Sequence, residues 1–505
     1  MERNIVLRPE KLKWLRSVDE RLVSYNIEMT EITGGTFWKS YTPGQIAGTE
    51  EFKVSGELSD FTAMADLMQY YPPIDLGNET LRERARALGP AWIRVSGSWA
   101  TKTYYDFEGT TGGRPPKGYA SVLTRSQWIG VLDFVRAVGG KLLVSVSNCE
   151  GDHPDGGALD LRQTEKLFNL SHEYGVDIDA AEFMNEPNML SFSGAPAGYT
   201  EADYARDQDI FNGWVKKHYP DCLLVGPCSL GEGAMGKTDI KSSGAGIGAG
   251  MRISTTDGLL KDTRIPLDVF SYHYYNGVSE RLAPVMPGAH WDANEAHTDE
   301  YLAVARNNAV AYAKLRDKYV PGGQMWVTES GDAGGGGDTW ASTYLDVFRT
   351  LNELGSFSEV TDGIIFHNTL ASSDYGFLSH GSFEPRPNYY AVLLWNRLVG
   401  RNVYVGELPE IKNAHVYFRS RSDNNPGLVC VAVNNSMREK LSVTVPCEAE
   451  VFSLSGNGDL RSRVLYLNGV PIDPGPEGGL PELRGKKVKA GAVEIAPGTC
   501  VFIRI

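Results

Sequence analysis

The sequence predicts an α/β protein, a (β/α)8 TIM barrel followed by a C-terminal antiparallel β-sandwich. Two observations carry this prediction. From about residue 20 to residue 400, short apolar runs alternate with amphipathic stretches, and Gly or Pro breaks separate them. After residue 400, short segments alternate apolar and polar side chains between turn dipeptides.

Eight apolar runs are the candidate barrel strands. They cover residues 22–28, 91–96, 141–147, 180–184, 222–226, 267–273, 324–328 and 362–367. The stretches between them repeat apolar residues at three- and four-residue spacing, as in 127–140, 161–175, 299–319 and 340–355. Eight buried strands that alternate with helices predict a closed parallel barrel.

The C-terminal segments predict a separate antiparallel domain. Their strands are expected at 414–421, 427–435, 440–445, 449–456, 462–470 and 498–505. Asn468-Gly469 and Pro497-Gly498 are turn signals between them. We therefore expect a barrel at 20–400, a sandwich at 401–505 and a separate N-terminal segment at 1–19.

Composition argues against several classes of partner. A net charge of −14 disfavours a grip on nucleic acid or another polyanion, because such polymers select basic faces. No apolar run reaches the roughly 18 residues that a membrane span needs, so no membrane partner is expected. The start, MERNIVLRPEKLKWL, lacks an apolar leader core. We expect a cytoplasmic location if this N-terminus is native, and a secreted or periplasmic one if a leader was removed. No oligomeric state is predicted.

Two glutamates stand where a barrel presents side chains to a substrate. Glu186, in AAEFMNEPNML, follows the run at 180–184, and Glu329, in QMWVTESGD, follows the run at 324–328. Two carboxyl groups that face each other across a pocket are what glycoside hydrolysis needs, with retention of configuration at a separation of about 5–5.5 Å. The alternative is that both are surface residues or members of buried ion pairs.

Further polar residues surround these positions. Asn185 is placed to hydrogen-bond a sugar hydroxyl, and Glu28, at the end of the first strand, is a candidate for the same role. His273 is either functional or a hydrogen-bonded core histidine. Arg94 on the second strand would lie near the two glutamates, or form a structural salt bridge; Glu182 is expected to be a paired barrel residue.

Two glycine-rich tracts have different meanings. Gly334–Gly337 closely follow Glu329, and successive backbone N–H groups without Cβ atoms nearby can form a nest for a sugar carboxylate. The tract 242–250 contains GxG spacing but does not open a helix after a first strand, so it predicts a loop and no dinucleotide site. The histidines show no paired zinc-ligand spacing. We expect neither a metal nor an organic cofactor.

Together these motifs resemble the heparanase/β-glucuronidase glycoside hydrolases, family 79 of the large retaining clan. The resemblance rests on AWIRVSGSWATKT (91–103), MNEPN (184–188), SYHYYNG (271–277), the ES and GGG after strand seven, and the tail from residue 462. It runs in order from about residue 20 to residue 505. It implies a TIM barrel with a β-sandwich to which an N-terminal segment, here NIVLRP at 4–9, adds a strand.

The resemblance also implies roles for individual residues. Glu186 matches the family's acid/base and Glu329 its nucleophile. Gly335 and Gly336 match its carboxylate-binding glycines. Tyr375, in the loop after strand eight, matches a substrate-binding tyrosine, and Tyr274 matches the tyrosine that contacts the nucleophile.

Departures from the family refine the expected function. Met184 stands where heparanases usually carry Gly, and the basic clusters that grip sulfated chains are not evident. The sequence therefore predicts an exo-acting retaining β-glycosidase that removes β-linked glucuronic acid from glycoconjugates or oligosaccharides. The alternatives are an endo-acting heparanase-like enzyme on glycosaminoglycan, a clan relative acting on a neutral sugar, and a non-catalytic carbohydrate-binding protein.

Overall fold

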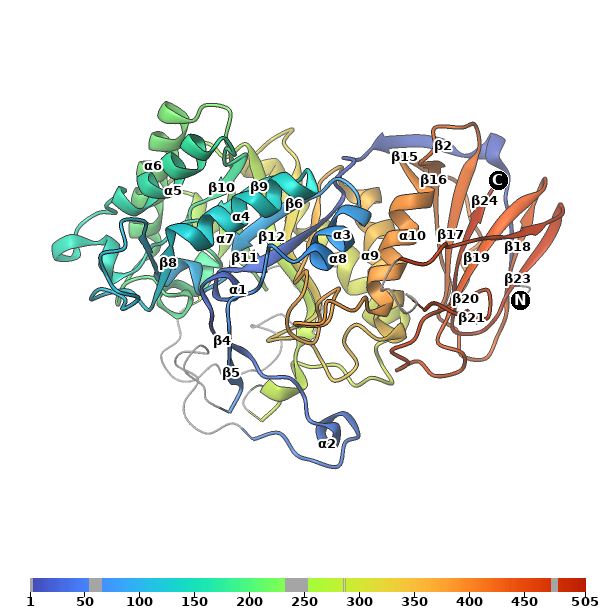
Figure 1. Cartoon of the computed structure of the whole chain (residues 1–505). Coiled ribbons are helices and arrows are strands. Elements are labelled where there is room, and N and C mark those ends of the chain that lie inside the picture. Colours follow the sequence, from blue (N-terminus) through green and yellow to red (C-terminus); the bar gives the residue numbers. More distant parts are fainter. Residues whose placement is uncertain (1–2, 54–65, 232–252, 285, 287, 474–479) are drawn as a thin grey trace.

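The computed structural model describes residues 3–53, 66–231, 253–284, 286, 288–473 and 480–505. Within this part of the chain, eight parallel strands close a barrel, and antiparallel sheets stand beside it (Figure 1). This confirms the predicted barrel with a β-sandwich. The tract 242–250, expected to be a loop, lies outside the described residues.

The barrel strands follow chain order around the ring, and the last pairs in parallel with the first. They are β3 (Val23–Glu28), β6 (Trp92–Ser96), β9 (Lys141–Ser145), β10 (Ala180–Glu182), β11 (Leu223–Leu230), β12 (Val269–Val278), β13 (Met325–Gly334) and β14 (Ile365–His367). β11, β12 and β13 continue beyond the predicted runs, because β11 stays paired with β12 up to Leu230, and β12 with β13 up to Val278 and Gly334.

The barrel interior changes from apolar to polar along its axis. At the end where the strands begin, inward side chains such as Trp92, Leu143 and Trp326 form an apolar plug. Two residues further along the same strand faces lie Arg94 and Ser145. Because this polar layer rests on a packed plug, its side chains have a fixed floor beneath them.

Helices cover the outside of the barrel. They are α3 (Glu79–Ala87), α4 (Arg125–Val138), α5 (Arg162–Tyr174), α6 (Glu201–His218), α7 (Thr256–Leu260), α8 (Asp299–Tyr319), α9 (Tyr344–Val360) and α10 (Pro387–Leu398). In α4, Thr124 and Gln127 form a capping box, and Gly139 ends the helix in the left-handed region. In the described part of the chain, no helix combines the length and apolarity that crossing a bilayer requires.

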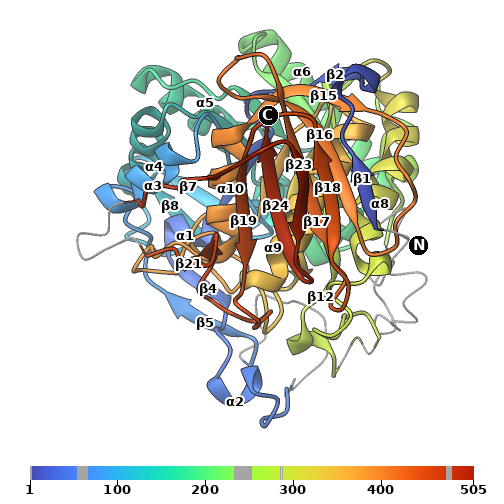
Figure 2. The same cartoon turned by 90° about the vertical axis from the view of Figure 1, so that its right-hand side faces the viewer.

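The β-sandwich consists of a small and a large sheet (Figure 2). The small sheet holds β1 (Asn4–Val6), β18 (Leu441–Val445) and β23 (Gly491–Ile495). The large sheet holds β2 (Lys13–Ser17), β15 (Val399–Val405), β16 (His415–Arg421), β17 (Leu428–Asn434), β24 (Thr499–Arg504), β19 (Ala449–Ser455), β20 (Tyr466–Leu467) and β21 (Val470–Pro471), with β22 (Lys486–Val488) against β19. Strands from the N-terminal segment thus lie in both sheets.

The large sheet is shared between the two parts of the molecule. In β17, Cys430 and Ala432 face the core between the sheets, whereas Val429 and Val431 belong to the core formed with the barrel helices. Every residue of β17 is buried, because both faces of the strand are covered. The large sheet therefore packs against the barrel helices with one face and against the small sheet with the other.

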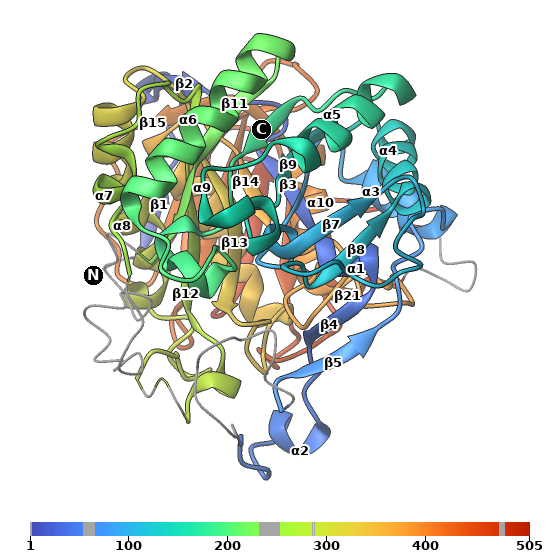
Figure 3. The same cartoon turned by 90° about the vertical axis from the view of Figure 1, so that its left-hand side faces the viewer.

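Segments after the early strands build one end of the barrel. They include α1 (Met29–Thr33), the pair β4 (Gly35–Trp38) and β5 (Met68–Tyr71), α2 (Pro43–Ile46), and the pair β7 (Thr103–Asp106) and β8 (Ser121–Thr124) (Figure 3). β4 begins shortly after β3 ends, so these segments stand at the C-terminal end of the strands.

Tyr344→Phe is expected to destabilise the protein. The single proton of the Tyr344 hydroxyl is shared between the carbonyls of Leu454 (2.7 Å) and Gly498 (2.9 Å), which joins α9 to the sandwich. Leaving these buried acceptors unpaired costs about 1–3 kcal/mol. Urea unfolding monitored by tryptophan fluorescence measures the loss. Tyr70→Phe is the control, since Tyr70 is 69% exposed, and an equal change in both variants would contradict the prediction.

Candidate active site

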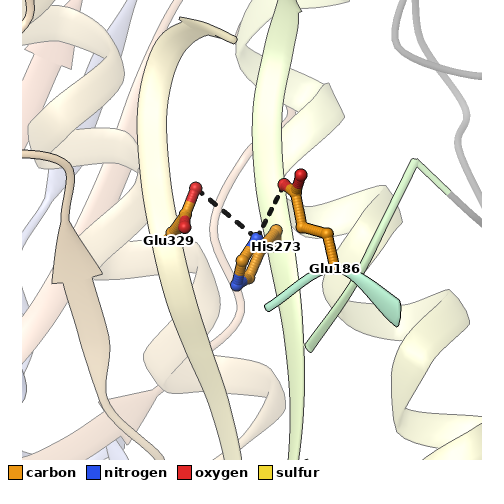
Figure 4. A group of neighbouring side chains, drawn as sticks. All are labelled: Glu186, His273 and Glu329. Carbon is orange, nitrogen blue, oxygen red and sulfur yellow. Dashed lines mark hydrogen bonds and ion pairs between the residues drawn. The ribbon is translucent and has the colours of Figure 1, made fainter. Parts of the chain in front are cut away.

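Glu186 and Glu329 face each other at the C-terminal end of the barrel (Figure 4). Glu329 is part of β13, and Glu186 lies between β10 and the 3-10 helix η6 (Pro187–Ser193). One carboxylate oxygen of each residue and a ring nitrogen of His273 all lie within 4.8 Å of one another. This separation fits the closely spaced carboxyl pair of retaining glycosidases and is too short for the inverting geometry of about 6.5–9.5 Å.

An irregularity in β13 turns Glu329 inwards. Trp326 faces the barrel interior, so strict alternation would point residue 329 outwards. The pairing with β12 shifts here: Tyr272 lies opposite Val327, but His273 lies opposite Glu329. Thr328 is therefore the extra residue of a β-bulge, a device that re-aims side chains beside active sites.

Glu186 is held in an unusual environment. Its backbone adopts a left-handed conformation with φ of 44°, which costs a residue with a Cβ of order 1–3 kcal/mol. Burial raises the pKa of Glu186 to about 7, against the opposing influence of Arg94. The side chain is therefore largely protonated below pH 7, as a general acid must be.

Arg94 connects the polar side chains of the barrel interior. Its guanidinium pairs with Glu182 (2.9 Å) and Glu329 (3.0 Å), and it also donates to Asn185 Oδ1 (2.8 Å). Burial by itself lowers the pKa of Arg94, but Glu182 and then Glu329 outweigh burial and raise it. The predicted pairing of Glu182 is confirmed. Arg94 is both a barrel salt bridge and a neighbour of Glu329.

His273 bridges the two glutamates. Its Nδ1 lies 2.9 Å from Glu186 Oε1 and 3.5 Å from Glu329 Oε2. Arg94 can only donate, so His273 Nε2, 3.3 Å from Arg94 Nη2, accepts and Nδ1 carries the proton. Burial lowers the pKa of His273 to about 4, which keeps the ring neutral.

The proton on His273 Nδ1 also bears on whether these three side chains could bind a metal ion. Glu186, His273 and Glu329 offer three ligand atoms at close range. A metal at Nδ1 would need the lone pair that the Nδ1 proton occupies, and Arg94 places a positive charge beside the same ring. The arrangement therefore fits a hydrogen-bonded carboxyl pair better than a metal centre.

The tyrosine that contacts Glu329 is Tyr275, so the prediction of Tyr274 was wrong. Tyr275 Oη donates to Glu329 Oε2 at 2.7 Å. Tyr274 points the opposite way, packs in the core beneath the helices, and bonds Asn276. The reason is strand alternation: His273 and Tyr275 share the inward face of β12, and Tyr274 lies on the other face.

Asn368 was missed by the sequence prediction. Its Nδ2 lies 3.0 Å from the Tyr275 hydroxyl and 3.1 Å from the Tyr375 hydroxyl. The two tyrosine rings lie 6.4 Å apart between centroids, so Tyr375 is brought to the site as predicted. Asn368 directly follows β14, a position that could have marked it, since polar residues after barrel strands face the site.

Glu28 is buried close to the other acids. Burial, followed by the charge of Glu329, raises the pKa of Glu28 well above its usual range. Its Oε2 has no hydrogen-bond partner among the described residues. A Cβ on Gly97 would lie 1.6 Å from this oxygen, so only glycine fits at that position. Glu28 therefore keeps an unused polar atom at the end of β3.

The glycine loop, residues 334–337, is anchored through its carbonyl oxygens. Ser279 donates its backbone N–H to Gly334 O (2.8 Å) and its hydroxyl to Gly335 O (2.9 Å). Ser373 Oγ donates to Gly336 O at 3.0 Å. A Cβ on Gly336 would lie 2.6 Å from Trp38 Cβ, where φ is +93°, so this position also demands glycine.

Arg281 ties the surrounding segments to this loop. It lies in the 3-10 helix η7 (Glu280–Leu282) and donates to Asp374 Oδ2 (2.8 Å) and to Tyr41 Oη (3.1 Å). Tyr41 Oη in turn donates to Gly337 O at 2.6 Å. The sequence prediction did not single out Arg281 or Tyr41, because their partners lie far away in the chain.

Comparisons with known proteins agree with this geometry. Heparanase-like protein 1 of Arabidopsis thaliana is 25% identical over 467 residues, covering 81% of this chain and 80% of that protein. Baicalin-beta-D-glucuronidase of Scutellaria baicalensis is 30% identical over 189 residues, 36% of each chain. No family model matches the chain.

Solved structures share the fold. The GH51 alpha-L-arabinofuranosidase of Thermotoga petrophila superposes with a TM-score of 0.63 at 14% identity, covering 99% of both chains. A 4-O-alpha-L-rhamnosyl-beta-D-glucuronidase of Fusarium oxysporum gives 0.61 at 11% identity, covering 99% of this chain and 100% of the other. At these identities the likeness concerns the fold alone.

The barrel, the sandwich and the homologous sequences identify the chain as a glycoside hydrolase. It is a relative of the heparanase and β-glucuronidase enzymes of family 79, over four fifths of its length in the case of the Arabidopsis protein. The predicted resemblance is thereby confirmed.

Glu186 is expected to titrate near pH 7 in the free protein. Its folded-state pKa is raised, so the carboxylic acid persists well above the ordinary glutamate range and is lost as the pH rises through about 7. Difference infrared spectra between about pH 5 and pH 9, with Glu186→Gln subtracted, isolate this group. Disappearance of the Glu186 acid band below pH 5 would contradict the assignment.

Proposed function

We propose that the protein is a retaining exo-β-glucuronidase in which Glu186 is the acid/base and Glu329 the nucleophile. The observation that carries the proposal is the closely spaced pair of carboxyl groups, with oxygens within 4.8 Å, in unlike environments. Glu329 receives hydrogen bonds from Arg94 (3.0 Å) and Tyr275 (2.7 Å), which stabilise a carboxylate. Glu186 is kept as the acid by burial.

In the first step Glu329 attacks the anomeric carbon of the sugar. The bond from that carbon to the glycosidic oxygen breaks, and Glu186 gives its proton to the departing oxygen. His273 Nδ1–H occupies Oε1 of Glu186, so the acidic proton resides on Oε2. The product of this step is a glycosyl ester on Glu329 and a free aglycone.

In the second step Glu186, now a carboxylate, takes a proton from water as the water attacks the anomeric carbon. The ester bond breaks, Glu329 returns to its carboxylate form, and Glu186 is again an acid. Arg94 and Tyr275 bind the carboxylate that forms as the ester leaves, so they favour this step too.

The glycine loop supports recognition of a sugar carboxylate. A trans peptide places its C=O and N–H on opposite sides, so anchoring the carbonyls of Gly334 and Gly335 on Ser279 turns the N–H groups of Gly335 and Gly336 away from it. No acceptor among the described residues takes either N–H. Backbone N–H groups that lack a partner suit an anion, and Tyr375 would complete the subsite.

Glu28 and Asn185 would bind sugar hydroxyls. The Oε2 of Glu28 has no hydrogen-bond partner among the described residues, and burial raises the pKa of this carboxyl group, so Oε2 is available to a sugar hydroxyl. Asn185 Oδ1 is occupied by Arg94, which leaves its amide N–H groups for the substrate. The net charge of −14 favours glucuronides without sulfate over a heparan chain, and thus exo action over endo action.

The first test is turnover of p-nitrophenyl β-D-glucuronide, with the β-D-glucoside and β-D-xyloside alongside. Release from the glucuronide alone supports the proposal. Release from a neutral sugar alone would favour a clan relative of other specificity, and release from none of the three, together with saturable binding, would favour a carbohydrate-binding protein.

Small nucleophiles should distinguish the two glutamates. Glu329→Ala is expected to lose at least about 10³-fold in kcat and, with azide, to yield the α-glucuronosyl azide, because azide then attacks directly. Glu186→Ala should still form the ester from an activated aryl glucuronide, and azide should trap it as the β-azide. Nuclear magnetic resonance of the products identifies each anomer. The reverse pattern would exchange the two roles.

Arg281→Met is expected to weaken glucuronide selectivity. Without Arg281, Asp374 and Tyr41 lose the donor that positions them, and the bond from Tyr41 to Gly337 O is weakened, so KM for the glucuronide should rise. A tenfold fall in the glucuronide-to-glucoside ratio of kcat/KM, about 1.4 kcal/mol, is the expected scale. Arg306→Met is the control, because Arg306 pairs with Glu359 at the surface. Equal losses on both substrates would indicate a role in folding alone.

A further inference from the structure

A cavity lies at the end of the barrel opposite to the glutamates. It has a volume of about 140 Å³ and is lined by residues 18–20 and 22 before β3, residues 87–90 before β6, the end of α10 with the start of β15, and Arg419 of β16. These segments belong to the barrel base and to the large sheet, so the cavity lies at the seam between barrel and sandwich.

Arg419 forms the buried wall of this cavity. The residue is only 2% exposed. Its Nε and Nη2 donate to Gly400 O at 3.2 and 3.0 Å, and Nη1 donates to Ser358 Oγ at 2.9 Å. The guanidinium carbon lies 5.5 Å from the ring centre of Trp395. Within the described chain, these contacts use three of the five N–H groups and include no carboxylate.

Three other buried arginines of this protein form ion pairs with carboxylates. Arg94 pairs with Glu182 and Glu329, Arg281 pairs with Asp374, and Arg349 pairs with Asp346 and Glu353. A buried charge without a counter-charge costs several kcal/mol, which is why buried ions are ordinarily paired. Arg419 differs from these three arginines and borders a cavity, where an anion can supply the counter-charge.

The cavity rim adds to the positive potential. Arg397 and Arg401 both line it and are exposed. Asp19 and Glu20 also line it, but Glu20 is engaged by the Arg21 guanidinium, and Asp19 accepts from the backbone N–H of Arg21. The chain as a whole has a net charge of −14, but three arginines surround this one small cavity. The electrostatic potential there is therefore locally positive.

We propose that this cavity binds a small oxyanion, such as phosphate, sulfate or a short carboxylate, on Arg419, and that the anion stabilises the seam between barrel and sandwich. Arginine's planar donors suit such oxygens. The volume is far above the 10–15 Å³ that one water needs, and is too small for an oligosaccharide. An anion that binds only the folded state raises the free energy of unfolding with its concentration.

Calorimetric titration of the full chain with phosphate, sulfate and acetate tests the proposal, with chloride keeping ionic strength constant. Saturable binding of at least one anion at millimolar concentration is expected, with a matching saturable rise in the urea midpoint. Arg419→Met should weaken binding at least about tenfold and abolish the rise. Arg421→Met, two residues along the same strand and paired with Asp423, should retain both.

Two outcomes would overturn the proposal. Absence of saturable binding to the wild-type protein removes the site, whether or not Arg419→Met folds. An equal midpoint rise in wild type and Arg419→Met would mean that the salts act through exclusion from the protein surface. The order of affinities among the three anions identifies which oxyanion the cavity prefers.

Discussion

The buried guanidinium of Arg94 is the constraint on which the site depends. A charge this deep in the barrel must be balanced, and Glu182 balances it from β10, two strands away from β6, while Glu329 does so from β13. The same group fixes the Asn185 amide and the tautomer of His273, and His273 then orients Glu186. Arg94 contacts Glu329 directly but is linked to Glu186 through His273. One cation therefore places the two carboxyl groups in different environments. Removing one partner of such a pair costs about 3–5 kcal/mol, so the geometry is strongly specified.

The loops at the C-terminal end of the barrel strands form a second set of contacts around the site. The wall beside Tyr275 and Tyr375 is a loop of glycines whose carbonyls are held by Ser279, Ser373 and Tyr41. These donors come from loops after three different strands, β12, β14 and β3. A rigid scaffold that presents several independent loops lets the region that would select the sugar vary without disturbing the carboxyl pair beneath it.

The sequence predicted those features that depend on a single local rule, such as the burial of a strand or the position of a residue at its end. Apolar runs marked all eight barrel strands, because a strand buried on both faces must be apolar, and the ends of those strands marked Glu186 and Glu329. Tyr274 was chosen by family likeness, although alternation along β12 from His273 would have selected Tyr275. The bulge at Thr328 could not be foreseen, since it is a property of the pairing between β12 and β13. Asn368 could have been marked by its place directly after β14, whereas the roles of Arg281 and Arg419 became visible only through contacts between segments distant in sequence.

The placement of the first strands has a consequence for how the chain is made. β1 and β2 are synthesised before the barrel strands, yet β2 pairs with β15 and β1 with β18, which both follow the barrel in the chain (Figure 1). At about 5–20 residues per second, roughly 20–80 s separate the synthesis of Ser17 from that of Val405. During this interval the barrel can assemble, while the N-terminal strands must wait, with Leu15 uncovered, for the domain that completes them. The nascent chain therefore carries an open strand edge throughout the translation of the barrel, and chaperones can bind this edge during that period.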